Sequence, residues 1–240
     1  MLKKYLTTAL FAGFTAGLIG AALQQILVIP VLLEAELYET GELVHFGATG
    51  QSGTDLIHDH DSHEHENDGQ FYRAVMTWLT MTANAIGLAL IIVAAMAMAE
   101  RAGHEITART GLLWGAAAFL VFQMLPAIGL PTELPGNAAA DLTVRKLWWA
   151  MAAFASAIGL ACIAFGRNWG LWSAGIVALA LPHLIGAPHP TQLSGVAPPE
   201  IAALFATRAL GVGLVTFVSL GGLLGYFWAS GAALASEETQ

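Results

Sequence analysis

Residues 74–99 read AVMTWLTMTANAIGLALIIVAAMAMA, a stretch without a charged side chain between Arg73 and Glu100. A helix needs roughly 20 consecutive, mostly apolar residues to cross the hydrocarbon core of a bilayer, and this stretch is longer than that. The rest of the chain has the same character, since 56% of its 240 residues are hydrophobic, 11% are charged, and the mean hydropathy is +0.65. Soluble globular domains are much less apolar. The sequence therefore predicts an all-α integral membrane protein whose function lies in its spans and short loops.

Five other apolar segments flank this one, so we expect about six transmembrane helices in a single transmembrane domain over residues 1–240. The expected spans cover residues 5–33, 74–99, 110–130, 147–165, 169–187 and 201–228. The fifth span is the shortest. The first apolar run continues to Leu33, beyond the core of a signal peptide, which favours a retained helix. Loop lysines and arginines show a modest bias that places the N-terminus in the cytoplasm, and the acid-rich loop at residues 34–72 then faces outward.

The even-numbered spans share a pattern that indicates an internal repeat. NAIGLAL, SAIGLAC and SLGGLLG follow, at the same offset, the arginines that begin these spans, which are Arg73, Arg145 and Arg208. The odd-numbered spans each carry a proline near the outer end, at Pro30, Pro126 and Pro182. We interpret this as three tandem helical hairpins with pseudo-threefold symmetry, which would leave a shared central path. The alternative is a chance alignment of Gly, Ala and Leu, which are common in membrane helices.

Small residues at helical spacing predict faces on which helices pack closely. One face runs along the first span, at Ala9, Gly13, Gly17 and Ala21. Two others are formed by Gly111 with Gly115 and by Gly221 with Gly225. These are signals of packing rather than of function.

A histidine-acid segment, DLIHDHDSHEHEND at residues 55–68, lies within the outward loop. Neutral imidazole is a good ligand for Co, Ni, Cu and Zn, and adjacent carboxylates concentrate cations. The expected ligands are His58, Asp59, His60, Asp61, His63 and His65. The competing interpretation is a solvated acidic loop without a role. If the segment binds metal, we expect it to collect the ion at the entrance and to leave selection to the membrane region.

Polar groups near the three prolines form a second candidate site. Glu34, Glu133 and His183 lie at equivalent outer ends of the expected hairpins, and His189 follows the last of them. Ionisable groups at such depth tend to face a wet cavity or one another, although a lone membrane histidine is more often a packing residue than a ligand. The arginines that begin the even spans repel a cation unless carboxylates neutralise them, and we expect Arg208 to need such a partner. The alternative for Arg73 and Arg145 is that they are interfacial anchors.

Five stretches of the chain read PVLLEAELYE (30–39), GLLWGAAAFLVFQMLPAIGLPTELPG (111–136), RKLWW (145–149), LPHLIGAPHP (181–190) and PPEIAALFATRAL (198–210). Together they resemble the CbtA family of predicted cobalt transporter subunits. The resemblance implies a multi-pass protein of the bacterial inner membrane, linked to cobalt supply for cobalamin synthesis. It also implies a small single-span partner of the CbtB type. The family is usually described with five spans, whereas this sequence predicts six.

Together these observations predict uptake of a divalent metal, with Co²⁺ as substrate rather than cofactor, by a transporter subunit that is not an enzyme. The alternatives are a non-transporting metal-binding accessory or sensor, and transport of another metal such as nickel. A haem protein lacks a second membrane histidine to pair with His183, and an anion carrier leaves the histidine segment unexplained. We expect contacts with membrane lipid and the metal ion but none with nucleic acid. Homo-oligomer formation is left open.

Overall fold

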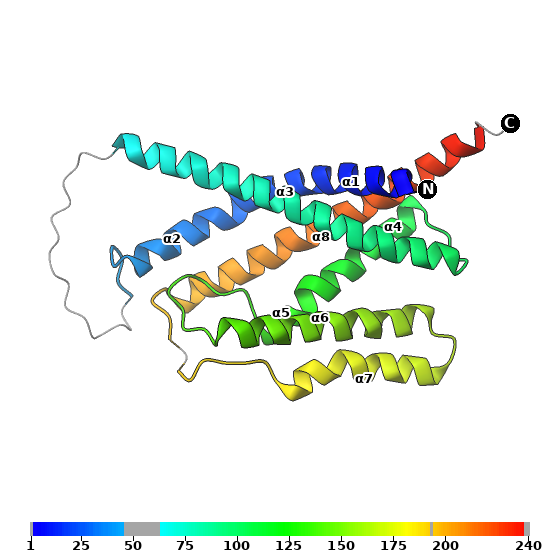
Figure 1. Cartoon of the computed structure of the whole chain (residues 1–240). Coiled ribbons are helices and arrows are strands. Elements are labelled where there is room, and N and C mark those ends of the chain that lie inside the picture. The colour runs from blue at the N-terminus through cyan, green and yellow to red at the C-terminus, as the bar shows by residue number, and fades with distance from the viewer. Residues whose placement is uncertain (1, 46–62, 193, 238–240) are drawn as a thin grey trace.

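The structure is a computed structural model that describes residues 2–45, 63–192 and 194–237, and every element in these ranges is a helix (Figure 1). In chain order the elements are α1 (Leu2–Leu23), η1 (Gln24–Val28), α2 (Ile29–Glu39), α3 (His63–Arg101), α4 (Ala108–Phe119), η2 (Leu120–Met124), α5 (Leu125–Gly129), α6 (Leu142–Phe165), α7 (Trp169–Ile185) and α8 (Pro199–Glu237). The elements η1 and η2 are π-helical turns inside longer helices. The predicted all-α membrane class is confirmed.

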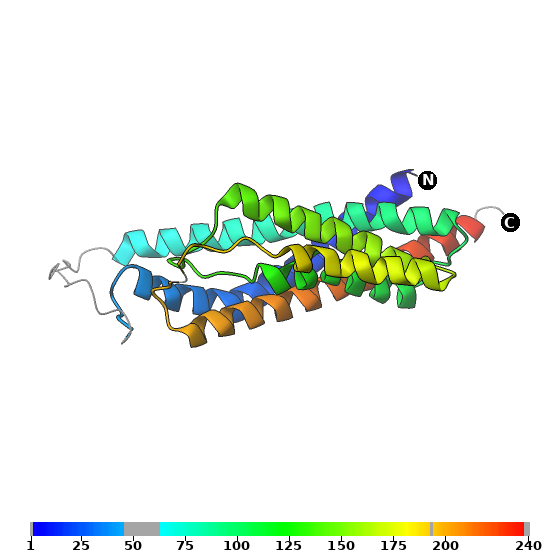
Figure 2. The ribbon, with the colours of Figure 1, turned by 90° about the horizontal axis from the view of Figure 1, so that it is seen from below.

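The helices run along one common direction, and both ends of the chain lie at the same end of the molecule (Figures 1 and 2). We call this the terminal end. The opposite end, where α2 ends, α3 begins and the loops at 130–141 and 186–198 lie, is called the loop end. Among the described residues, five helices are long and apolar enough to cross a membrane. The sixth, α7, has 17 residues and runs back beside α6. At 1.5 Å per residue it is about 25 Å long, at the lower limit for a span.

The helices extend further than the apolar segments predict. Both ends of the expected loop at 34–72 are helical, because α2 continues to Glu39 and α3 begins at His63. Helix α8 likewise continues past Trp228 to Glu237. Hydropathy marks only the part of a helix that lies in hydrocarbon, so it does not predict where a helix ends in water or among headgroups.

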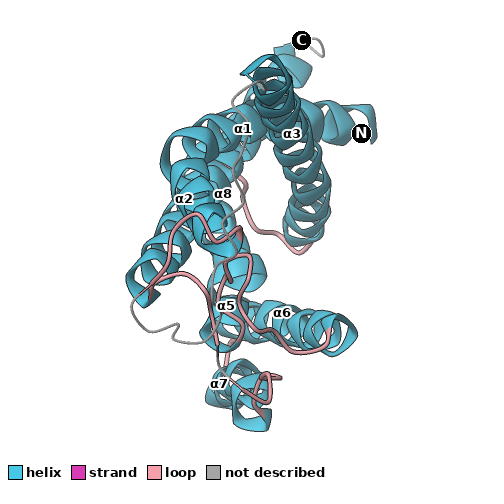
Figure 3. Cartoon of the chain, turned by 90° about the vertical axis from the view of Figure 1, so that its left-hand side faces the viewer, coloured by secondary structure: helices cyan, strands magenta, loops and turns pink. Residues whose placement is uncertain are grey.

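The pairing of the helices differs from three tandem hairpins. The principal partners are α1 with α3, α4 with α8, and α6 with α7, while α8 also packs against α1. Figure 3 shows α6 and α7 together on one side of the molecule and α1 and α3 together on the other. Only the first expected hairpin is therefore paired along its length. In the second, α6 packs against η2 and α5 at the end of the preceding span, and in the third the main contact of α7 in the described part of the chain is with α6.

Glycines allow these partners to approach closely. Gly111 and Gly115 of α4 lie against Gly221 and Gly225 of α8, so the two predicted small-residue faces contact each other. A Cβ on Gly111 would come within 2.8 Å of the Gly225 Cα, closer than real Cβ atoms approach. Likewise, a Cβ on Gly13 of α1 would come within 2.6 Å of the Ile86 Cα in α3. Backbones this close gain van der Waals contact, which is what drives helix association in lipid.

The terminal end is closed by aromatic and polar contacts between three helices. Trp228 of α8 is 1% exposed and donates its indole N–H to Glu100 Oε1 of α3 at 2.9 Å. Tyr5 of α1 stacks on the same indole, with 4.8 Å between ring centroids. The loop end, by contrast, holds the prolines and most of the predicted site residues.

Candidate functional site

Two π-helical turns occupy equivalent places in the first and second repeats. Turn η1 ends at Val28, two residues before Pro30. Turn η2 ends at Met124, two residues before Pro126. Proline has no N–H to donate to the preceding turn, and a π turn relieves the resulting mismatch by inserting an extra residue. Pro182 lies within the continuous helix α7, so the third repeat lacks this feature. Such turns occur often at functional sites.

Both π turns make polar contact with one turn of α8. The Arg208 guanidinium donates from Nη1 to the Leu27 carbonyl of η1 at 2.9 Å. From the other side, Gln123 of η2 donates from Nε2 to the Ala209 carbonyl at 3.0 Å, and its side chain lies directly against Gly213. A side chain at residue 213 would collide with this amide. The two helix irregularities are therefore joined through α8.

The predicted carboxylate partner of Arg208 is wrong. Arg208 binds a backbone carbonyl, and the ion pairs found among the described residues belong to the other two arginines. The guanidinium is a charged donor, and its hydrogen bond to the Leu27 carbonyl takes the place of the expected carboxylate.

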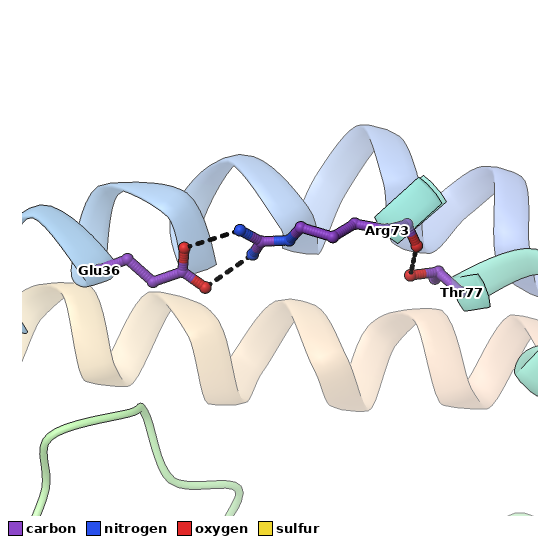
Figure 4. Close-up of polar contacts among 3 residues, drawn as sticks. All are labelled: Glu36, Arg73 and Thr77. Carbon is purple, nitrogen blue, oxygen red and sulfur yellow. Dashed lines mark hydrogen bonds and ion pairs between the residues drawn. The ribbon is translucent and has the colours of Figure 1, made fainter. Parts of the chain in front are cut away.

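Arg73 and Arg145 are each neutralised by a glutamate, as expected. Arg73 forms a bidentate pair with Glu36 of α2, with Nη2–Oε1 at 2.7 Å and Nη1–Oε2 at 3.2 Å (Figure 4). Figure 4 also shows the Thr77 hydroxyl bonded to the Arg73 carbonyl at 2.8 Å. Arg145 Nη2 lies 2.7 Å from Glu133 Oε2. The side chains of the first pair are 52% and 31% exposed, and those of the second are 26% and 27% exposed.

The second pair borders a shallow cleft of about 940 Å³ at the loop end. Glu133, Arg145 and Lys146 line it together with Trp149 and apolar loop residues. The loop beneath is held in place by Leu134, which is buried among η1, α2 and α8, and by a backbone hydrogen bond from Ala138 N to Ser194 O at 2.8 Å. The side chain of Glu133 is therefore presented by an ordered loop.

The predicted site residues do not form one cluster. Glu34 is exposed on α2, where its neighbour Glu36 forms the ion pair. His189 lies with Asp141 in a second cleft of about 620 Å³. His183 packs edge-on against Trp148, at 5.9 Å between ring centroids. Within the part of the chain that the structure describes, no three His, Cys, Asp or Glu side chains are close enough to hold a metal ion.

Most of the predicted histidine-acid ligands lie outside the described residues. These are His58, Asp59, His60 and Asp61. His63 and His65 belong to the first turns of α3, at the loop end, but their side chains are not among those described. Metal binding by this segment stays a prediction.

Sequence reasoning did not identify Trp148 as a site residue. Its indole is 6% exposed and contacts His183, and Gly129 lies directly against its ring. In the sequence, RKLWW contributes only to the family resemblance. The spacing of Arg145 and Trp148, one helical turn apart, was the available signal that both lie on one face of α6.

A comparison with known protein families identifies a match. The family model described as "Probable cobalt transporter subunit (CbtA)" matches residues 2–229, which is nearly the whole chain. No curated protein and no solved structure matches the chain.

Proposed function

The chain belongs to the CbtA family of probable cobalt transporter subunits, and from this premise we propose that it carries Co²⁺ inward across the bacterial inner membrane. In this proposal the N-terminus and the terminal end lie in the cytoplasm. The loop end then faces outward, where it receives the ion.

The observation that carries the proposal is the pair of neutralised glutamates at the loop end. Glu36 and Glu133 are fixed by Arg73 and Arg145, each on the segment that follows a π turn and a proline. An ionised carboxylate attracts a divalent ion more strongly than a guanidinium, because the ion carries twice the charge. The arginine balances the carboxylate when no metal is bound, and the arriving ion displaces it. A carboxylate alone would also attract Na⁺ and protons.

The histidine-acid segment supplies the ion in this scheme. His58, His60, His63 and His65, with Asp59 and Asp61, collect Co²⁺ from the outer solution and release it to the carboxylates. Helix α3 begins at the loop end (Figure 1), where Glu36 and Glu133 form their ion pairs, which supports a short transfer. Glu34, His183 and His189 offer further ligands along the way.

The driving force is the membrane potential. The sequence contains no phosphate-binding loop of the Gly-rich lysine type, so we assign no ATP hydrolysis to this chain. Moving one charge through 100 mV is worth about 2.3 kcal/mol, and a divalent ion gains roughly twice that. A small single-span subunit of the CbtB type is the proposed partner.

Uptake into liposomes tests the proposal. The purified chain is reconstituted with and without the single-span partner, an inside-negative potential is imposed, and entry of Co²⁺, Ni²⁺ and Zn²⁺ is measured. We expect Co²⁺ to enter fastest. Metal binding without entry would instead identify a non-transporting accessory. Faster entry of Ni²⁺ than of Co²⁺ would identify nickel as the preferred substrate.

A variant with alanine at His58, His60, His63 and His65 tests the collecting role. We expect slower uptake at low Co²⁺ concentration and near-normal uptake at high concentration, because the segment raises the local metal concentration only. Replacement of His45 by alanine is the matched control, since it lies in the same outward segment but outside the histidine cluster. Unchanged uptake at every concentration would remove the segment from the mechanism.

A further inference from the structure

Three buried nitrogen atoms without a hydrogen-bond partner belong to neighbouring residues of α6 and α7. They are Arg145 Nε, Trp148 Nε1 and His183 Nε2, and we call these three residues the polar seam. In the described part of the chain, the fourth such atom is Gln25 Oε1 in η1. Buried polar atoms are nearly always hydrogen-bonded in native proteins, so three orphans in one place indicate a bound group that satisfies them.

The packing places these atoms in one neighbourhood. Arg145 and Trp148 are one turn apart on the same face of α6, where side chains are adjacent. The His183 ring meets the Trp148 ring edge-on at 5.9 Å between centroids. The end of α5 covers the indole, since a Cβ on Gly129 would come within 2.7 Å of Trp148 Cζ2. Trp148 is only 6% exposed, so lipid and bulk water do not satisfy its N–H.

The chemistry of the three groups defines the occupant. Arginine and tryptophan are donors only, whereas the imidazole Nε2 accepts a hydrogen bond in one neutral tautomer. The occupant must therefore accept hydrogen bonds and be able to donate one. An anion is disfavoured because Glu133 already neutralises Arg145 at 2.7 Å. Water meets both requirements and carries no charge.

We propose that the polar seam binds water, which links the Glu133–Arg145 pair to His183 through the contact of α5, α6 and α7. The water site itself is independent of transport. Its role rests on the proposed function. The water connects His183 to the aqueous phase at the loop end, so that an ion released from Glu133 reaches an imidazole that is already hydrated.

Radiolytic hydroxyl-radical labelling of the full chain in lipid nanodiscs, without metal, tests the proposal. Bound water generates radicals beside the side chains that it contacts, so buried groups next to water become oxidised. Trp228 is the internal control, because it is also buried, at 1% exposed against 6% for Trp148, but donates its N–H to Glu100. The measurement is made in a Trp149→Phe background, since Trp149 is exposed and adjacent in sequence. We expect several-fold more oxidation of Trp148 than of Trp228.

A second variant tests the part played by the imidazole. His183→Leu removes the acceptor, so we expect oxidation of Trp148 to fall toward the level of Trp228, while Trp228 itself reports that the fold is intact. Equal oxidation of the two tryptophans before the substitution would overturn the proposal. So would a loss of Trp148 oxidation when chloride or phosphate is added, since that identifies an anion as the occupant. No result here depends on cobalt uptake, so failure of the water site and failure of the transport function are distinguishable.

Discussion

Glu133 and Arg145 form the less exposed of the two ion pairs at the loop end, and a charge swap separates their structural role from their transport role. Glu133→Arg places two cations together and should lower stability by about 1–3 kcal/mol, because a partly buried charge loses its partner. The double variant Glu133→Arg with Arg145→Glu restores the attraction. We expect it to recover the thermal midpoint but not Co²⁺ uptake, because the loop now presents a cation to the arriving ion.

The same swap at Glu36 and Arg73 is the matched control for stability. This pair is more exposed, at 31% and 52%, so solvent screens it and its contribution is expected to be about 0–1 kcal/mol. Full recovery of uptake in the Glu133–Arg145 double variant would show that only the ion pair matters, which would contradict a carboxylate that receives the metal.

The two π-turn glutamines are expected to respond oppositely to substitution by leucine. Gln123 donates to Ala209 at 3.0 Å, so Gln123→Leu should destabilise the protein by about 1 kcal/mol and loosen η2 from α8. Gln25 holds a buried oxygen without a partner, and Gln25→Leu should leave stability unchanged or raise it, because an apolar group replaces an unsatisfied acceptor. Thermal unfolding in detergent gives both values. A destabilised Gln25→Leu variant would mean that its oxygen has a partner in the protein as it exists in a membrane.

At the scale of residues, the sequence predicted the types of group at the site better than their partners. Glutamates near prolines and arginines at the starts of the even spans were recognised, and two of the three arginines are paired with glutamate. The exception is Arg208, which donates to the Leu27 carbonyl of η1, and no side-chain pattern predicts a π turn. Trp148 was missed because burial between α5, α6 and α7 depends on a pairing that the sequence did not reveal.

At the scale of elements, the contact between α4 and α8 depends on glycines that face each other. Gly221→Ala adds a methyl group where the backbone of α4 already lies, and we expect a loss of about 1–3 kcal/mol from overpacking. Gly211→Ala is the control on the same helix, because its Cβ would meet nothing within 4 Å. There alanine should be neutral or stabilising by roughly 0.5–1 kcal/mol, since it favours helix. Equal effects at the two positions, measured by unfolding in mixed micelles, would contradict the close contact.

The helices themselves were predictable, and their partners were not. An apolar run long enough to span a bilayer must form a helix to satisfy its backbone, so all six helices were expected. The small-residue faces were also expected, but a face of glycines does not specify which other glycine face it meets. The repeat suggested that neighbours in sequence pair, whereas α8 pairs with α4 and α7 with α6. The equivalence that does persist between the first two repeats is local: a π turn, a proline and a paired glutamate.

At the scale of the whole molecule, the number of crossings depends on α7. It has 17 residues, fewer than the other spans, and its loop to α8 lies at the loop end beside the ion pairs (Figure 1). If α7 crosses the bilayer, there are six spans and both termini share one side. If it does not, there are five, and the loop at 186–198 lies on the same side as the turn between α3 and α4.

Cysteine labelling in intact cells distinguishes the two topologies. In a Cys162→Ser background, single cysteines replace Thr191, in the loop after α7, and Ala102, in the turn after α3; both residues are exposed. If α7 spans the bilayer, a membrane-impermeant maleimide added outside should label the cysteine at 191. The cysteine at 102 should be labelled only after the membrane is permeabilised. Protection of both would place α7 outside the set of spans, with the loop at 186–198 on the cytoplasmic side. Labelling at 191 alone requires that 17 residues suffice, which a locally thinned bilayer or tilted neighbours allow at a cost of fractions of a kcal/mol per ångström.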